Sequence, residues 1–129
     1  MREFRGAYTA LITPFAGDAV DYEGLRKNVR YQIENRIDGL VVLGTTAETP
    51  TLTESEKEKI IETVCKEAAG RIPIIVGTGS NSTQATIQQT RQAKQAGADA
   101  ALIVTPYYNK PGQEGIFRHF EAITQAIDY

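Results

Sequence analysis

The stretch Leu40-Val41-Val42-Leu43-Gly44-Thr45-Thr46-Ala47-Glu48-Thr49 joins an apolar run to a loop rich in hydroxyl groups. A helix-start pattern, Thr53-Glu54-Ser55-Glu56, follows, so the loop lies where a buried strand leads into a helix. In α/β folds, the carboxyl ends of parallel strands are where ligands bind. Gly44 permits a close backbone approach, and the two threonines offer hydroxyl and N–H groups that suit a small anion such as a carboxylate. A turn whose hydroxyls satisfy only backbone groups fits the same residues.

The composition fits a single domain over residues 1–129, or part of a larger one, with 41% apolar residues. The net charge of −2 and the lack of a basic block disfavour nucleic acid as a partner. The single cysteine, Cys65, excludes an internal disulfide, favours a cytoplasmic location and fits a buried position in a helix. The apolar run near the N-terminus is too short and too polar for a signal peptide or a membrane span.

Strands and helices are predicted to alternate along the chain. The apolar runs predict strands at residues 7–12, 40–43, 74–76 and 100–104, and residues 15–18 form a predicted turn. Helices are expected to begin near Asp21, Thr53, Ser82 or Asn81, and Gln113. Thr53 and Glu56 have capping-box spacing, and Gly70 is a stop signal for the second helix.

Four strand–helix units at intervals of roughly thirty residues favour a (β/α)8 barrel, because no dinucleotide fingerprint follows the first strand. A complete barrel takes about 250 residues, so this α/β chain corresponds to half of a TIM barrel. The first and fourth strands of a half barrel are unpaired edges, and its inner face is an open apolar patch. We therefore expect one of three situations: the barrel continues in a longer chain, two copies pair, or the open sheet packs on another copy.

Polar side chains follow each predicted strand and are expected at one end of the barrel. They are Thr13, Thr45-Thr46, Thr78-Gly79-Asn81 and Tyr107-Tyr108-Asn109. No cluster of histidine, cysteine and carboxylate has metal-ligand spacing, so we expect neither a metal site nor a cofactor.

Four further residues have competing interpretations. His119 lies inside the fourth helix and is interpreted as a surface or packing residue, because no Ser-His-Asp set can be assembled around it. Glu48 could act as a base, but a carboxylate at a helix entry more often accepts backbone N–H groups. Tyr107 and Tyr108 could anchor an interface, or a tyrosine hydroxyl could relay a proton with a threonine.

Four motifs carry a family resemblance across the whole chain: Thr13-Pro14-Phe15, Gly44–Thr49, Gly77–Asn81 and Thr105–Pro111. In order and spacing they resemble the dihydrodipicolinate synthase family of pyruvate-dependent class I aldolases, to which N-acetylneuraminate lyase also belongs. The double threonine and the Tyr-Tyr-Asn-Lys-Pro run favour the synthase over the lyase. The resemblance covers only the amino-terminal half of the family's barrel.

The resemblance implies condensation of pyruvate with L-aspartate semialdehyde, on the route to lysine, through a Schiff base between pyruvate and a lysine. Thr45 matches the threonine of a Thr-Tyr-Tyr proton relay, and Thr46 matches the residue that holds the pyruvate carboxylate. Tyr108 matches the relay tyrosine that reaches into a neighbouring subunit's site, and Tyr107 matches its partner at that tight dimer interface. The resemblance also implies a homo-oligomer, a tetramer in the family, with no membrane or nucleic-acid partner.

The family's Schiff-base lysine, its third relay residue and its semialdehyde-binding arginine match positions beyond residue 129. The lysines present here read as helix-surface or loop residues, so we expect the 129-residue chain alone to be inactive; they are Lys27, Lys57, Lys59, Lys66, Lys94 and Lys110. A different pyruvate-dependent aldolase of the same family and a non-catalytic, self-associating half barrel are the alternatives.

Two further positions depart from the family pattern. Ala47 replaces a usual glycine, a change that should be tolerated if φ is negative there. Ala85, Glu54 and Lys57 replace the glutamate and histidines of lysine-inhibited members, which predicts weak or absent lysine feedback in the parent enzyme.

Overall fold

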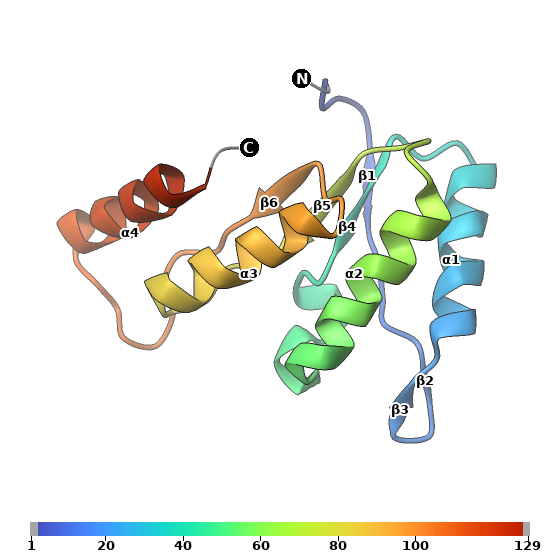
Figure 1. The fold of residues 1–129 in the computed structure, drawn as a ribbon, viewed down its shortest axis with the longest axis horizontal. Helices are drawn as coiled ribbons and strands as arrows, with labels where there is room; N and C mark the ends of the chain where they lie inside the picture. Colours follow the sequence, from blue (N-terminus) through green and yellow to red (C-terminus); the bar gives the residue numbers. More distant parts are fainter. Residues whose placement is uncertain (1–2, 128–129) are drawn as a thin grey trace.

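A computed structural model describes residues 3–127, so residues 1–2 and 128–129 of the expected domain lie outside it. Its centre is a four-stranded parallel sheet in the order β1-β4-β5-β6 (Figure 1). The strands are β1 (Tyr8–Ala10), β4 (Gly39–Val42), β5 (Ile74–Gly77) and β6 (Ala100–Leu102). Parallel neighbours joined by helices confirm the predicted half barrel.

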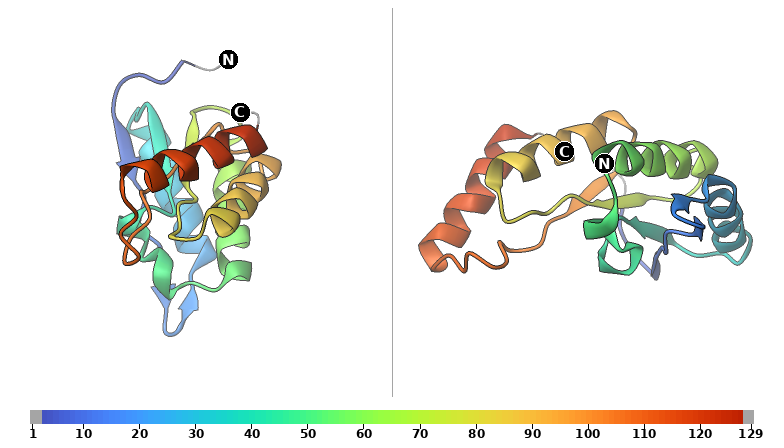
Figure 2. Two further views of the ribbon diagram at one scale, coloured as in Figure 1. Left: turned by 90° about the vertical axis from the view of Figure 1, so that its left-hand side faces the viewer. Right: turned by 90° about the horizontal axis from the view of Figure 1, so that it is seen from below.

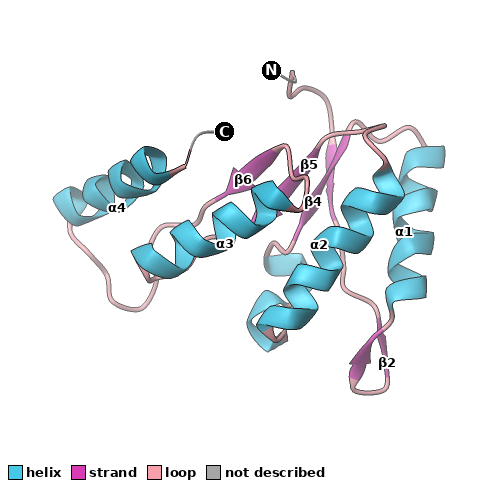
Figure 3. Ribbon diagram, in the orientation of Figure 1, coloured by secondary structure: helices cyan, strands magenta, loops and turns pink. Residues whose placement is uncertain are grey.

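Four helices follow the strands at the predicted places (Figure 3). They are α1 (Tyr22–Glu34), α2 (Glu54–Ala68), α3 (Thr83–Gln95) and α4 (Gln113–Ala126). The right-hand view of Figure 2 shows α2, α3 and α4 along one side of the strand layer. The opposite side of the sheet carries no long helix within residues 3–127, so the barrel's inner face is open.

Local capping bonds explain where three of the helices begin. The Asp21 carboxylate accepts the Gly24 N–H at 2.8 Å, as the sequence predicts. The Thr53–Glu56 capping box is present in both directions. Ser82 rather than Asn81 caps α3, because its hydroxyl accepts the Ala85 N–H at 3.3 Å.

The core lies between the sheet and the helices. Alternate strand residues point towards the helices and are buried, among them Leu40, Val42 and Val76. Leu25 and Val29 of α1 and Ile60 and Val64 of α2 close the other side of this layer. Because these side chains come from successive βα units, the four units form one continuous core.

The turn predicted at residues 15–18 is present at residues 17–18, where it joins two short strands that were not predicted. Phe15–Ala16 (β2) pairs with Ala19–Val20 (β3) in antiparallel fashion. Val20 is buried while β2 is exposed, so the hairpin is held to the core from one side. Two-residue strands are too short to show an alternating pattern in the sequence.

Three predicted strands end earlier than expected, and the first of them, β1, stops at Ala10 rather than continuing to residue 12. Leu43 has a φ of 55°, so β4 stops at Val42. β6 stops at Leu102 rather than continuing to residue 104. The second helix does end as predicted, with Ala69 at a φ of 48° and Gly70 at 73°. Among the described helices, none is long and apolar enough to cross a membrane.

Candidate functional site

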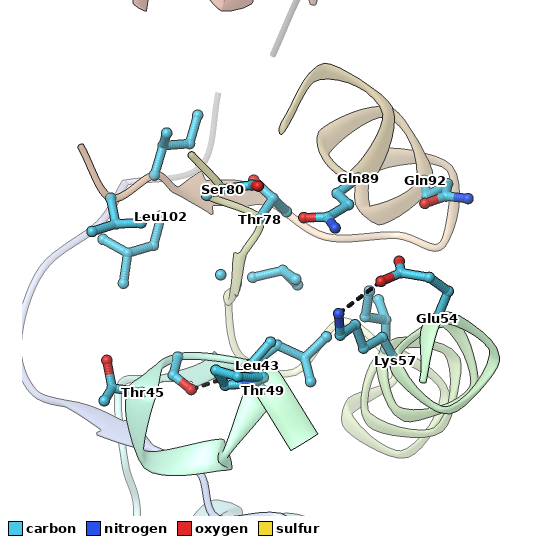
Figure 4. A pocket seen from close by; sticks show the side chains of 18 of the residues that line it. Leu43, Thr45, Thr49, Glu54, Lys57, Thr78, Ser80, Gln89, Gln92 and Leu102 are labelled. Carbon is cyan, nitrogen blue, oxygen red and sulfur yellow. Dashed lines mark hydrogen bonds and ion pairs between the residues drawn. The ribbon is translucent and has the colours of Figure 1, made fainter. Parts of the chain in front are cut away.

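A cavity of about 670 Å³ lies at the carboxyl ends of β4, β5 and β6 (Figure 4). Its wall combines polar side chains with apolar ones that belong to the sheet. The lining residues from the loops after the strands include Gly44, Thr45, Thr49, Thr78, Ser80, Val104 and Tyr107. Helices α2 and α3 add Glu54, Lys57, Gln89 and Gln92. The strand ends therefore converge on a space large enough for a small organic molecule.

The central loop folds into two single-turn 3₁₀ helices, Thr45–Ala47 and Thr49–Thr51. Side-chain hydroxyls hold this shape from within. Thr49 Oγ1 donates to the Gly44 carbonyl at 2.9 Å, and Thr13 Oγ1 donates to the Ala47 carbonyl at 2.9 Å. No side chain caps the first 3₁₀ helix, so its leading N–H groups have no capping partner from a side chain.

Neighbouring strand ends approach the central loop very closely. A side chain at Gly77 would overlap the carbonyl of Leu43, and one at Gly79 would overlap the backbone of Val104. These glycines allow the loops after β4, β5 and β6 to meet around the cavity. Ala47 lies outside the left-handed region and is buried, so its methyl group is accommodated as expected.

Thr45 and Thr46 occupy different positions despite being adjacent. Both are exposed, but only Thr45 lines the cavity. Figure 4 shows the Thr45 side chain on the cavity wall that Leu102 faces. Thr46 belongs to the same 3₁₀ turn but is not among the residues that line the cavity.

The two tyrosines after β6 also separate. Tyr107 lines the cavity, whereas Tyr108 is 91% exposed and lies outside the lining. Asn109 fixes this loop, because its Nδ2 donates to the Asn81 carbonyl at 3.2 Å. Tyr108 adopts a left-handed backbone conformation, with a φ of 69°. The structure thus brings Thr45 and Tyr107 to one cavity and leaves Thr46 and Tyr108 outside it.

The family model described as the dihydrodipicolinate synthetase family matches residues 3–129. The chain belongs to this family. A relative from Protochlamydia amoebophila named 4-hydroxy-tetrahydrodipicolinate synthase is 64% identical over 126 residues, which cover 97% of this chain and 42% of that protein. The chain therefore spans about two fifths of the length of this relative.

Solved structures of the family superpose closely on the chain. The chloride-inhibited dihydrodipicolinate synthase from Acinetobacter baumannii, complexed with pyruvate, has a TM-score of 0.94 and 47% identity. The match covers 95% of this chain and 43% of that one. The protein CdNal from Clostridium difficile, solved in complex with mannosamine, has a TM-score of 0.94, 30% identity and coverages of 98% and 44%. The TIM-barrel assignment from the sequence is confirmed by these structures.

Two of the hydroxyls expected at the strand ends are hydrogen-bonded within the scaffold. Thr13 and Thr78 are both buried. The Thr78 hydroxyl lies 2.7 Å from that of Thr90, which in turn donates to the Thr86 carbonyl. Each of these two hydroxyls therefore has a hydrogen-bond partner inside the protein, and of the two only Thr78 also lines the cavity.

Glu48 also differs from its expected structural role. Its side chain makes no capping hydrogen bond, and its φ of 55° places it between the two 3₁₀ helices. His119 is a packing residue, one of the two roles foreseen. It is buried between α4 and α3, and its Nδ1 lies 2.9 Å from Thr83 Oγ1.

Lys57 was predicted on the helix surface, and this prediction is wrong. Its side chain is only 18% exposed, lines the cavity and forms an ion pair with Glu54 at 2.7 Å. Figure 4 shows this pair across the cavity from Gln89 and Gln92 of α3. Helical periodicity separates buried from exposed faces but cannot show that an outer face borders a cavity. The sequence analysis therefore missed Lys57, Gln89 and Gln92.

Proposed function

We propose that the chain is the amino-terminal, substrate-binding half of a 4-hydroxy-tetrahydrodipicolinate synthase. The proposed reaction joins pyruvate to L-aspartate semialdehyde through a lysine Schiff base, in the cytoplasmic route to lysine through diaminopimelate. The observation that carries the proposal is the cavity at the strand ends with Thr45 on its wall, in a chain 64% identical to a relative of that name. The pyruvate complex of a structural neighbour supports the choice of substrate.

Each proposed site residue has a position compatible with its role. Thr45 presents a hydroxyl to the cavity, so it can exchange a proton with a neighbouring tyrosine. Thr46 lies in the first turn of the uncapped 3₁₀ helix, where a carboxylate can accept both its N–H and its hydroxyl. Neither role depends on a metal or an organic cofactor.

The exposure of Tyr108 supports a homo-oligomer. A relay tyrosine that is 91% exposed and outside the lining of its own chain's cavity is placed to serve a neighbouring subunit. Tyr107, which is half in the cavity and half at the surface, would pack beside it at the tight dimer interface. Tetramer formation would then use other surfaces.

The nucleophile of the proposed reaction is not among this chain's lysines. The lysines outside the cavity are all solvent-exposed; they are Lys27, Lys59, Lys66, Lys94 and Lys110. Lys57 borders the cavity, and its Nζ is engaged in an ion pair with Glu54 at 2.7 Å. We infer that residues 1–129 form a domain half that binds substrate and lacks the Schiff-base lysine.

Borohydride trapping tests this assignment. The chain and its full-length parent are each incubated with pyruvate, reduced with borohydride and digested for peptide mass spectrometry. We expect an adduct in the parent on a lysine outside residues 1–129, and none on this chain alone. An adduct on Lys57 or Lys110 would show that the nucleophile has been assigned wrongly.

The relay role of Thr45 is tested in the full-length parent. Thr45→Val should lower kcat for pyruvate and aspartate semialdehyde by about 100-fold or more, because a positioned proton-transfer group is lost. Thr51→Val is the matched control: its hydroxyl donates to the Glu48 carbonyl at 2.8 Å, outside the cavity lining. A Thr45→Val enzyme with unchanged kcat would refute the relay.

A different aldolase of the same family is the second candidate. The observation that favours it is the close structural match to CdNal, which was solved with mannosamine. Comparing kcat/KM of the parent for aspartate semialdehyde and for sugar aldehydes decides between the two. Lysine inhibition can be measured on the same full-length parent. We expect it to be weak or absent, because Ala85 offers no carboxylate to an amino group and Lys57 carries the same positive charge as the lysine ligand's ammonium. Inhibition by micromolar lysine would contradict this expectation.

A further inference from the structure

Thr86, near the start of α3, is a polar residue with 0% of its surface exposed. Its hydroxyl oxygen accepts the Ser80 N–H at 3.0 Å. Its hydroxyl hydrogen is shared between two carbonyl oxygens, that of Ser82 at 3.0 Å and that of Ser80 at 3.3 Å. One helical side chain thus binds the backbone of the preceding loop on both sides of Asn81.

A threonine in a helix often bonds only a carbonyl group of its own helix, and such a bond has no consequence for a neighbouring loop. Thr63 of α2 is an example, because its hydroxyl donates to the Lys59 carbonyl at 2.6 Å, four residues earlier. Thr86 differs, since it also accepts an N–H from Ser80, which lies outside its helix. Its hydroxyl therefore braces the loop after β5 as well as the helix.

The braced loop in turn anchors the loop after β6. The Asn81 carbonyl accepts Asn109 Nδ2 at 3.2 Å, and the Asn109 N–H donates to the Tyr107 carbonyl at 2.8 Å. Tyr108 and Lys110, on either side of Asn109, both have a positive φ. A strained segment of this kind persists only where surrounding contacts hold it, and the bond from Asn109 to the loop after β5 is one of these contacts.

We propose that Thr86 is a positioning residue for Tyr107 and Tyr108. It acts through the hydrogen bond from Asn109 to Asn81, which ties the two loops together. The inference rests on the proposed function, in which the two tyrosines serve the proton relay and its interface. The path joins two neighbouring βα units, whose strands β5 and β6 are paired in the sheet. It does not include the central loop after β4, so its loss should impair proton transfer and leave pyruvate binding in place.

Steady-state kinetics of the full-length parent with pyruvate and aspartate semialdehyde is the first test. Thr86→Val keeps the shape of the side chain and removes its hydroxyl. It should lower kcat by about 10-fold or more, because a misplaced proton-transfer group reacts slowly. KM for pyruvate should change by less than about twofold, since the central loop is not part of the path. Thr86→Ser keeps the hydroxyl and should restore most of kcat.

Ile87→Val is the matched control. Ile87 is the next residue of α3, is 8% exposed and lies outside the cavity lining. Its shortening costs stability in urea unfolding but removes no hydrogen bond from either loop, so kcat should stay within about twofold of the unmodified parent. The proposal is overturned if Thr86→Val keeps its kcat, if Thr86→Ser does not restore it, or if Ile87→Val loses as much.

A double-mutant cycle tests the route. Asn109→Ala should lower kcat by a factor similar to that of Thr86→Val. The double variant should be no slower than the slower single variant, because both changes break the same path. If the two factors multiply instead, Thr86 does not act through Asn109 and the proposal is wrong.

A crystal structure of the Thr86→Val parent gives a readout that does not depend on activity. The distance from Asn109 Nδ2 to the Asn81 carbonyl oxygen, 3.2 Å in this chain, should exceed about 3.5 Å. An intact bond would refute the positioning role. If the unmodified parent does not condense the two substrates, the proposed function fails, while this distance still decides whether Thr86 positions the loop.

Discussion

Gly77 is the position where one added methyl group should disturb the fold and the central loop together. It is the last residue of β5, and a Cβ there would overlap the carbonyl group of Leu43. That neighbour is backbone, which cannot rotate aside as a side chain can. Leu43 already lies at a φ of 55°, so a shift must be taken up by the loop that carries Thr45. Overpacking of this kind costs about 1–3 kcal/mol.

Urea unfolding of Gly77→Ala measures the cost. With a slope of about 1–3 kcal/mol per molar urea, a loss of about 2 kcal/mol lowers the midpoint by about 1 M. Gly44→Ala is the matched control: a Cβ at Gly44 meets only Val41 Cγ1 at 3.6 Å, and its φ is −79°. The control should lie within about 0.5 kcal/mol of the unmodified chain. If both variants unfold at the same urea concentration, the close approach of β5 to the loop does not constrain the fold.

Three further predictions follow from local contacts. Thr53→Ala should cost about 1 kcal/mol in urea unfolding, because the Glu56 N–H loses its acceptor and the Glu56 carboxylate loses the Thr53 hydroxyl, keeping only the bond from the Thr53 N–H. The hydrogen bond from Arg30 lowers the pKa of Glu67. The stabilisation that this pair gives the folded state should therefore be complete above about pH 4.5 and be lost as the pH drops through that lowered pKa. In Glu67→Gln, the free energy of unfolding should fall less steeply with decreasing pH on the acid side. If its pH dependence is the same as in the unmodified chain, the pairing does not contribute. Burial raises the pKa of Cys65 to about 11, so iodoacetamide should modify it at pH 8 roughly 100-fold more slowly than an ordinary thiol.

Local signals predicted the helices well because their determinants lie within a few residues. Asp21 caps α1 and Thr53 caps α2 through bonds that span three residues of sequence. The parallel order of the sheet followed from the repeat of strand and helix. The β2–β3 hairpin was missed because two-residue strands carry no periodic pattern and are held by tertiary contacts of Val20.

The composition of the site was less predictable, because burial decides which hydroxyls are available. Thr13, Thr45 and Thr78 have the same side chain and similar positions after strands, yet Thr13 and Thr78 are buried and bonded internally. Lys57 shows the opposite case, since its helical position reads as surface while its side chain borders the cavity. Whether a side chain is buried or borders the cavity depends on which helix or loop packs against it in the folded chain. No pattern of neighbouring residues in the sequence encodes that packing.

Backbone strain provides an independent indication of where function lies. Among the described residues, six other than glycine have a positive φ. Arg36 and Ala69 lie just beyond helix ends, where this conformation is ordinary.

The remaining four lie in the loops after β4 and β6, around Thr45 and Tyr107; they are Leu43, Glu48, Tyr108 and Lys110. A left-handed leucine or tyrosine costs roughly 1–2 kcal/mol and persists only where surrounding contacts determine it. The hydrogen bonds from Thr49 to Gly44 and from Asn109 to Asn81 are such contacts, one in each loop. Two strained loops face one cavity, and each is held by its own side-chain hydrogen bond. We infer that the strain is retained because it shapes the cavity wall, and not because the fold needs it. A half barrel could connect its strands and helices without either strained turn.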